Sequence, residues 1–141
     1  MKKIAIINGP NLNLLGEREQ EIYGSQHFED YLSLLSEKHD EIEFSYFQSN
    51  VEGEIINALQ EVALEVDGIL LNAAGYSHTS IAIADSIRAI AAPVVEVHIS
   101  NIHAREEYRQ HSLTAKYCQG CITGFGLNSY ELGLIALISK D

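Results

Sequence analysis

The chain has 141 residues, 46 % of them hydrophobic, and a formal net charge of -11 at pH 7. That length suits one domain with a single buried core. The negative charge argues against nucleic acid, which is bound through clustered Lys and Arg, and it does not favour an anionic membrane surface. The apolar runs are too short to cross a bilayer or to act as a signal peptide, so we expect a soluble, cytoplasmic protein.

The first half of the chain predicts two strands, a long loop and two helices. Residues 5–7 form a short apolar strand, and the segment from 8 to 25 has no regular period. Apolar side chains recur at helical spacing from Phe28 to Leu35, and residues 42–46 alternate as in a half-exposed strand. Asn50 can cap the helix that follows.

The second half continues the alternation and indicates the fold class. Its predicted elements are a strand at 69–71, a helix ended by Pro93, a strand at 94–98, a short helical piece at 105–109, a strand at 121–123 and a helix at 129–138. Strands separated by helices imply a parallel sheet, because parallel neighbours need a long connection. We therefore expect an α/β, flavodoxin-like, doubly wound sheet of five parallel strands in order 2-1-3-4-5, with helices on both faces.

Polar side chains gather in the segments that follow strands one, three and four, which are residues 8–24, 72–80 and 96–109. In a doubly wound sheet these strand ends are neighbours, and ligands bind beyond them. The same segments hold three of the four arginines, namely Arg18, Arg105 and Arg109. An acidic protein that gathers its positive charge at this edge is expected to bind a small anion there.

Within these segments, Glu96 and His98 give the strongest indication of function. They occupy alternate positions of an otherwise apolar strand, so both project to the same side and need a partner or a ligand there. Asn11 and His78 have equally simple explanations, as a turn residue and as a residue at a helix start. A loop residue such as Tyr23 is more often part of the surface than of a catalytic site.

The two cysteines, Cys118 and Cys121, form one Cys-x-x-Cys pair. A zinc site would need two further ligands, for which His103 and His111 are conceivable. A thioredoxin-type redox pair normally starts a helix, whereas Cys121 runs into a predicted strand. We interpret the pair as buried, reduced cysteines, and we expect no metal and no cofactor.

Three motifs resemble those of the type II 3-dehydroquinases of aromatic amino-acid biosynthesis (the shikimate pathway). They read GPNLNLLGEREQEIYG over residues 9–24, LNAAGYSHTS over 71–80 and EVHISNIHAREEYRQHS over 96–112. The similarity covers essentially the whole chain in the same order, and it implies a single catalytic domain over residues 1–141. Family members often have Pro where this chain has Gln20, and the cysteine pair is outside the pattern.

This resemblance implies a hydro-lyase that removes water from 3-dehydroquinate, a small anionic keto-acid, to give 3-dehydroshikimate. The family's reaction is an anti elimination through an enolate, without a metal or a Schiff base. Tyr23 matches the base, and Arg18 matches the residue that favours its phenolate, with Arg105 as a second cation. Asn11 matches the residue that stabilises the enolate through an ordered water.

The remaining site residues also follow from the resemblance. His98 matches the acid that protonates the departing hydroxyl, and Glu96 would hold that imidazole. Substrate binding carries over to the backbone amides near Ile99 and Ser100 and to the side chains of Asn72, His78 and Arg109. Asp85 matches a residue that reaches the site of a neighbouring subunit. The family forms dodecamers built from trimers, so we expect a homo-oligomer.

Other functions on the same fold remain open. A flavodoxin-like FMN protein would need a Ser/Thr/Gly-rich phosphate loop after strand one, where this chain has Pro10 and several leucines. A phospho-receiver domain would need an acidic cluster there and an aspartate where strand three ends in Asn72. The non-enzymatic alternative is a small-molecule-binding or scaffold protein that has lost activity, although all the matching catalytic residues are present.

Overall fold

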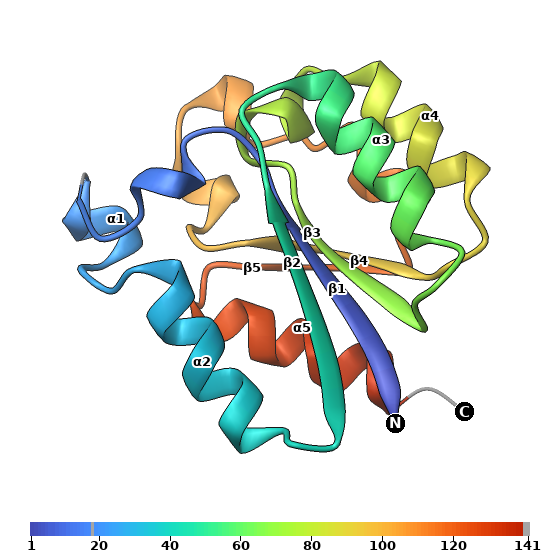
Figure 1. The fold of residues 1–141 in the computed structure, drawn as a ribbon. Helices are drawn as coiled ribbons and strands as arrows, with labels where there is room; N and C mark the ends of the chain where they lie inside the picture. The colour runs from blue at the N-terminus through green and yellow to red at the C-terminus, as the bar shows by residue number, and fades with distance from the viewer. Residues whose placement is uncertain (18, 140–141) are drawn as a thin grey trace.

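The computed structural model describes residues 1–17 and 19–139, which fold around one parallel sheet (Figure 1). Its strands are β1 (Lys2–Asn8), β2 (Ile42–Gln48), β3 (Gly68–Asn72), β4 (Val94–His98) and β5 (Gly120–Thr123). Their order across the sheet is β2-β1-β3-β4-β5, and every neighbouring pair is parallel. The predicted flavodoxin-like order is therefore confirmed.

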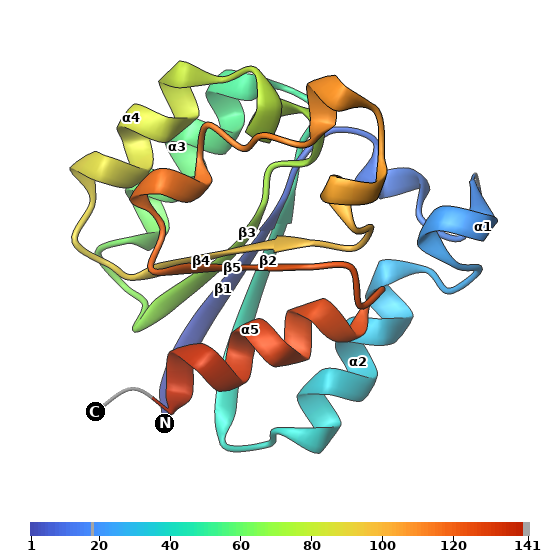
Figure 2. The ribbon, with the colours of Figure 1, turned by 180° about the vertical axis from the view of Figure 1, so that it is seen from behind.

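Helices cover both faces of the sheet, as Figures 1 and 2 show from opposite sides. On one face lie α2 (Phe28–Lys38) and α5 (Asn128–Ile138), and on the other lie α3 (Glu52–Val62) and α4 (Ile81–Ala89). The connections contain the short helix α1 (Gln20–Tyr23) and 3-10 helices at Leu12–Leu14, Ala74–His78, Ile102–Ala104, Glu107–Arg109 and Ala115–Tyr117. None of the helices in the described segments has the length and apolar character that a bilayer crossing requires.

Strand burial follows position in the sheet. Every residue of β3 and β4 is buried, because helices cover both faces of these central strands. Leu70 belongs to the core beneath α5, and its neighbour Leu71 belongs to the core beneath α3. The edge strands are more open, with Glu43 exposed on β2 and Cys121 exposed on β5.

The loop after β1 lies directly against the segment after β3. The Gly9 amide donates a hydrogen bond to the Asn72 carbonyl at 2.7 Å. A Cβ atom at Gly9 would lie 2.6 Å from the Ala73 carbonyl oxygen, so only glycine fits this contact. The first two polar segments are thereby joined at one edge of the sheet.

Asn50 does not cap α3, so this prediction was wrong. The residue at the N-cap is Val51, which makes no side-chain cap bond. Asn50 Oδ1 instead accepts hydrogen bonds from the Asn11 amide at 2.9 Å and from Gln48 Nε2 at 3.2 Å. The asparagine therefore anchors the loop after β1, and a tertiary contact takes the place of the local cap.

The limits of α4 also differ from the prediction. The helix ends at Ala89, before Pro93, because Ile90 already has an extended backbone. At the other end, the Ser80 hydroxyl accepts a hydrogen bond from the Ile83 amide at 2.9 Å. One of the hydroxyls beside His78 thus acts as a helix cap.

Candidate active site

A cleft lies beyond the carboxyl ends of β3 and β4, where doubly wound sheets bind their ligands. Its volume is about 160 Å³. The predicted site residues that line it are Asn11, Tyr23, Asn72, His78, His98, Ile99, Ser100 and Arg109. The three polar segments are thus brought together, as the strand order predicted.

Other predicted site residues stand apart from this lining. Glu96 lies behind the cleft and contacts it through His98. Asp85 is exposed on α4 and does not line the cleft of its own chain. Arg18 lies outside the described residues.

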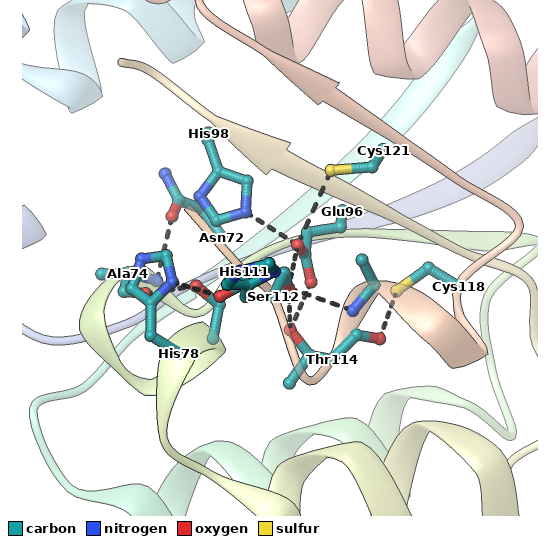
Figure 3. A network of polar contacts seen from close by, with 12 residues as sticks. Asn72, Ala74, His78, Glu96, His98, His111, Ser112, Thr114, Cys118 and Cys121 are labelled. Atoms are coloured by element: carbon teal, nitrogen blue, oxygen red, sulfur yellow. Dashed lines mark hydrogen bonds and ion pairs between the residues drawn. The ribbon is translucent and has the colours of Figure 1, made fainter. Parts of the chain in front are cut away.

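Glu96 and His98 form a buried pair beneath the cleft. His98 Nε2 and Glu96 Oε2 are 2.7 Å apart, which confirms that the two side chains project to the same side. The carboxylate also accepts hydrogen bonds from the hydroxyls of Ser112, at 2.6 Å, and Thr114 (Figure 3). Burial alone would raise the pKa of Glu96, but the contact with His98 and the two hydroxyls hold it below its usual value. The carboxylate therefore stays ionised and fixes the imidazole.

Thr114 was missed by the sequence analysis because its contact with Glu96 depends on how a loop folds back. We expect Thr114→Val to lower the free energy of unfolding by about 1.5–3 kcal/mol, the usual range for a hydrogen bond to a charged group. Thr114→Ser keeps the hydroxyl and is the matched control. Urea unfolding measures both.

This prediction also has a definite pH dependence. A carboxyl whose pKa is depressed by folding stabilises the protein above the pKa of the unfolded chain, about 4.3, and this contribution is lost as the pH falls. The deficit of Thr114→Val should be largest near neutral pH and shrink in acid. An equal loss of unfolding free energy at neutral and at acidic pH would mean that the Thr114 hydroxyl does not act on the charged carboxylate.

Tyr23 faces the cleft from the end of α1 and contacts a cation. Its phenol oxygen accepts a hydrogen bond from Arg105 Nη1 at 2.9 Å, and the guanidinium carbon lies 5.8 Å from the centre of the ring. Arg105 Nη1 also lies 3.3 Å from the Ser100 hydroxyl. In the described part of the chain, Arg105 is thus the cation that contacts Tyr23, while the part assigned to Arg18 stays a prediction.

Asn72, at the end of β3, is fixed by a buried hydrogen-bond chain. Its Nδ2 donates to the Tyr130 hydroxyl at 2.9 Å, and that hydroxyl donates to Asn8 Oδ1 at 2.7 Å. Asn72 Oδ1 accepts from the amide of Ala74, a residue with a left-handed backbone (φ 52°). Because both amide ends have partners, the orientation of Asn72 is set, and the second Nδ2 hydrogen remains for a ligand. Tyr130 was not singled out by the sequence analysis.

His78 is positioned as a hydrogen-bond acceptor. Its Nδ1 lies 2.8 Å from the His111 carbonyl oxygen, which can only accept, so Nδ1 carries the hydrogen. Burial is the main cause that lowers the pKa of His78, and the nearby charges of His98 and Arg109 act in the same direction. A neutral ring with hydrogen on Nδ1 leaves Nε2 able to accept a hydrogen bond from a ligand hydroxyl.

Arg109 adds a second cation to the lining of the cleft. Its Nε donates to Glu106 Oε2 at 3.3 Å, and its guanidinium carbon lies 5.3 Å from the ring centre of Tyr108. These contacts within one short turn limit the movement of a long side chain. Arg105 and Arg109 thus place two guanidinium groups at the cleft, each at ion-pair distance from Glu106. The third arginine of the prediction, Arg18, lies outside the described residues.

The cysteines depart from the prediction in one respect. Both thiols are free, but neither cysteine is fully buried, since Cys118 is half-buried and Cys121 is exposed. Burial of the sulfur and the charge of Glu96 raise the pKa of Cys121 to about 12, so little reactive thiolate exists at neutral pH. Among the described residues, His103 and His111 form no ligand group with either thiol, whereas Glu96, His98 and Cys121 lie together.

Comparisons with known proteins agree with this geometry. The family described as "Dehydroquinase class II" has a sequence model that matches residues 2–138. The chain is 54 % identical over 138 residues to a 3-dehydroquinate dehydratase of Aliarcobacter butzleri, covering 96 % of this chain and 84 % of that protein. It is 54 % identical over 140 residues to a 3-dehydroquinate dehydratase of Caldicellulosiruptor bescii, covering 97 % of each. The crystal structure of a type II dehydroquinase from Butyrivibrio crossotus is similar with a TM-score of 0.93 and 42 % identity, covering 97 % of each chain.

Proposed function

Because the chain belongs to the class II dehydroquinase family, we propose that it converts 3-dehydroquinate to 3-dehydroshikimate and water. The observation that carries this proposal is that two polar pairs, Tyr23 with Arg105 and Glu96 with His98, meet at one cleft. An elimination beside a ketone needs a base, donors for the enolate oxygen and an acid for the departing hydroxide. The cleft supplies a candidate for each.

The base is Tyr23. A guanidinium that donates a hydrogen bond to the phenol oxygen stabilises negative charge there, and Arg105 Nη1 makes this contact at 2.9 Å. The phenolate takes the proton from the carbon beside the ketone and becomes a neutral phenol. Arg18 is proposed to add to the same positive field.

The enolate formed in this step is stabilised from the loop after β1. Asn11 lines the cleft with a left-handed backbone (φ 70°), and its amide is held by Asn50 Oδ1. The Asn11 side chain would bind the enolate oxygen through a water molecule, and the fixed backbone supports this role. Such a fixed donor stabilises charge that develops only during the reaction.

The acid is His98. When the enolate re-forms the ketone, the carbon–oxygen bond to the hydroxyl breaks, and His98 donates a proton so that water leaves. Glu96 holds the ring from behind and stabilises its charged form. The proton taken by Tyr23 balances the proton given by His98, and transfer through solvent returns both groups to their starting states.

Substrate binding uses the remaining residues of the lining. The substrate carboxylate binds at the backbone amides of Ile99 and Ser100, which follow β4, with the free Nδ2 hydrogen of Asn72 beside them. Arg109 and the acceptor nitrogen of His78 bind the ring hydroxyls. The hydrogen bonds that hold Asn72, His78 and Arg109 support this assignment.

The test of this proposal is the growth of enone absorbance when the pure protein meets 3-dehydroquinate. We expect turnover without added metal or cofactor, and EDTA should not reduce it. A protein that binds 3-dehydroquinate without forming product would support the non-catalytic binding or scaffold function instead. Activity lost to EDTA and restored by a metal would contradict the proposed mechanism.

We also propose that the enzyme works in the cytoplasm as a homo-oligomer, a dodecamer built from trimers. Asp85 is exposed on α4 and lies outside the cleft of its own chain, as a residue acting on a neighbouring site would. Sedimentation should give a mass far above the 15.6 kDa of one chain. Asp85→Asn should raise KM, whereas Asp30→Asn, an exposed change on α2, should not. A fully active monomer would show the assignment of Asp85 to be wrong.

A further inference from the structure

Cys121 reaches the Glu96–His98 pair from the neighbouring strand. Glu96 on β4 is in register with Cys121 on β5, and the thiol donates a hydrogen bond to Glu96 Oε2 at 3.6 Å. His98 Nε2 contacts the same oxygen at 2.7 Å. Figure 3 shows the thiol and the imidazole directed at one carboxylate oxygen. The sulfur, nitrogen and oxygen atoms all lie within 4.8 Å of one another.

This set of atoms suits a divalent cation of borderline softness. Zn²⁺ binds thiolate sulfur at about 2.3 Å and imidazole nitrogen or carboxylate oxygen at about 2.0–2.2 Å, so its ligands stand roughly 3–4 Å apart. The three side chains are within this range after small movements, and a water molecule can take a fourth position. Thr114 contacts the other carboxylate oxygen, so that contact need not change, and the cation would share Oε2 with the Ser112 hydroxyl, which donates to it at 2.6 Å.

Charge and access favour a cation at this place. The chain carries a net charge of -11, so the surrounding potential attracts cations. Cys121 lies on the edge strand β5 and is exposed as a residue, so the site is close to solvent even though the sulfur itself is partly buried. The proposed substrate cleft is lined by His98 but not by Cys121. The substrate and the cation would therefore approach the imidazole from different sides.

We propose that Glu96, His98 and Cys121 bind a divalent cation of the Zn²⁺ type and that this cation inhibits the enzyme. The cation takes the place of the hydrogen between His98 Nε2 and Glu96 and of the hydrogen on the Cys121 thiol, and both protons pass to solvent. The imidazole then no longer has the carboxylate that holds it for proton donation. The inhibition rests on the proposed function of His98, whereas the binding of the cation does not.

The experiment titrates Zn²⁺ against turnover in a phosphine-reduced buffer without chelators. We expect reversible inhibition of the wild-type enzyme that EDTA relieves. Cys121→Ser should keep nearly normal basal turnover, because serine can donate the same hydrogen bond, and it should need at least about tenfold more Zn²⁺, given that even outer-shell changes alter metal affinity by ~10–100-fold. Cys118→Ser, whose thiol bonds the Thr114 carbonyl, is the matched control and should behave as wild type.

Co²⁺ provides a measurement that does not depend on activity. Wild-type protein and Cys118→Ser should show a thiolate-to-cobalt charge-transfer band that Cys121→Ser lacks. Equal Zn²⁺ inhibition of wild type and Cys121→Ser, or the absence of this band from wild type, would overturn the proposal. If Co²⁺ binds through Cys121 but 3-dehydroquinate is not dehydrated, the cation site stands and the proposed function fails.

Discussion

Tyr23→Phe should reduce turnover by ~10²–10⁴-fold, the usual cost of losing a catalytic base. The phenol oxygen is the atom that Arg105 contacts, and the substitution removes that oxygen while keeping the ring in the cleft. Because Tyr23 is proposed to act only in the transition state, its loss should lower kcat while KM changes little. Steady-state kinetics with 3-dehydroquinate, followed by enone absorbance, measures both quantities.

Tyr117→Phe is the matched control for this variant. Tyr117 is a half-buried tyrosine that does not line the cleft, so its hydroxyl should be dispensable for turnover. If Tyr23→Phe kept more than about a tenth of wild-type turnover, Tyr23 would not be the base.

The same argument separates the two arginines assigned to Tyr23. Arg105→Lys keeps the charge but loses the planar fork that places Nη1 on the phenol oxygen. A shift of the low-pH limb of its pH–rate profile to higher pH, where the base must lose its proton, would show that Arg105 supports the phenolate. If the pH–rate profile changes in Arg18→Lys instead, Arg18 is the residue that supports the phenolate, as the sequence resemblance implied.

The sequence predicted the fold well because periodicity and strand order carry most of it. The largely apolar strands β3 and β4 require cover on both faces, and alternation with helices requires parallel pairing. The local cap at Asn50 failed for a physical reason. An asparagine side chain bonds whichever amide is near, and folding brings the Asn11 amide to it from a loop far away in sequence.

Contacts of the candidate site could be predicted where both residues lie on one strand. Contacts between residues on separate loops were harder to predict. Glu96 and His98 share one side of a strand, so their contact follows from the pleat. The contact of Arg105 with Tyr23 joins residues 82 positions apart, and no spacing rule relates them. Tyr130 illustrates the same limit, because its partners Asn8 and Asn72 come from two other elements.

His98→Asn should also lower turnover by ~10²–10⁴-fold, because it removes the proposed acid for the departing hydroxyl. Loss of a partner from a buried pair can itself destabilise a protein by ~3–5 kcal/mol, since it leaves a buried charge. In this site Ser112 and Thr114 still donate to Glu96, so the cost should be smaller and the variant should fold. Urea unfolding and kinetics on the same preparation separate lost stability from lost chemistry.

Two further variants distinguish proton donation from mere packing. Glu96→Gln keeps the shape of the side chain but removes the charge that stabilises the imidazolium, so it should lower turnover less than His98→Asn and alter the pH–rate profile. His103→Asn, an exposed histidine outside the cleft lining, is the matched control and should be as active as wild type. A pH–rate profile that is unchanged in Glu96→Gln would mean that the carboxylate only positions the ring. Retention of more than about a tenth of wild-type turnover by a folded His98→Asn would remove His98 from the role of acid.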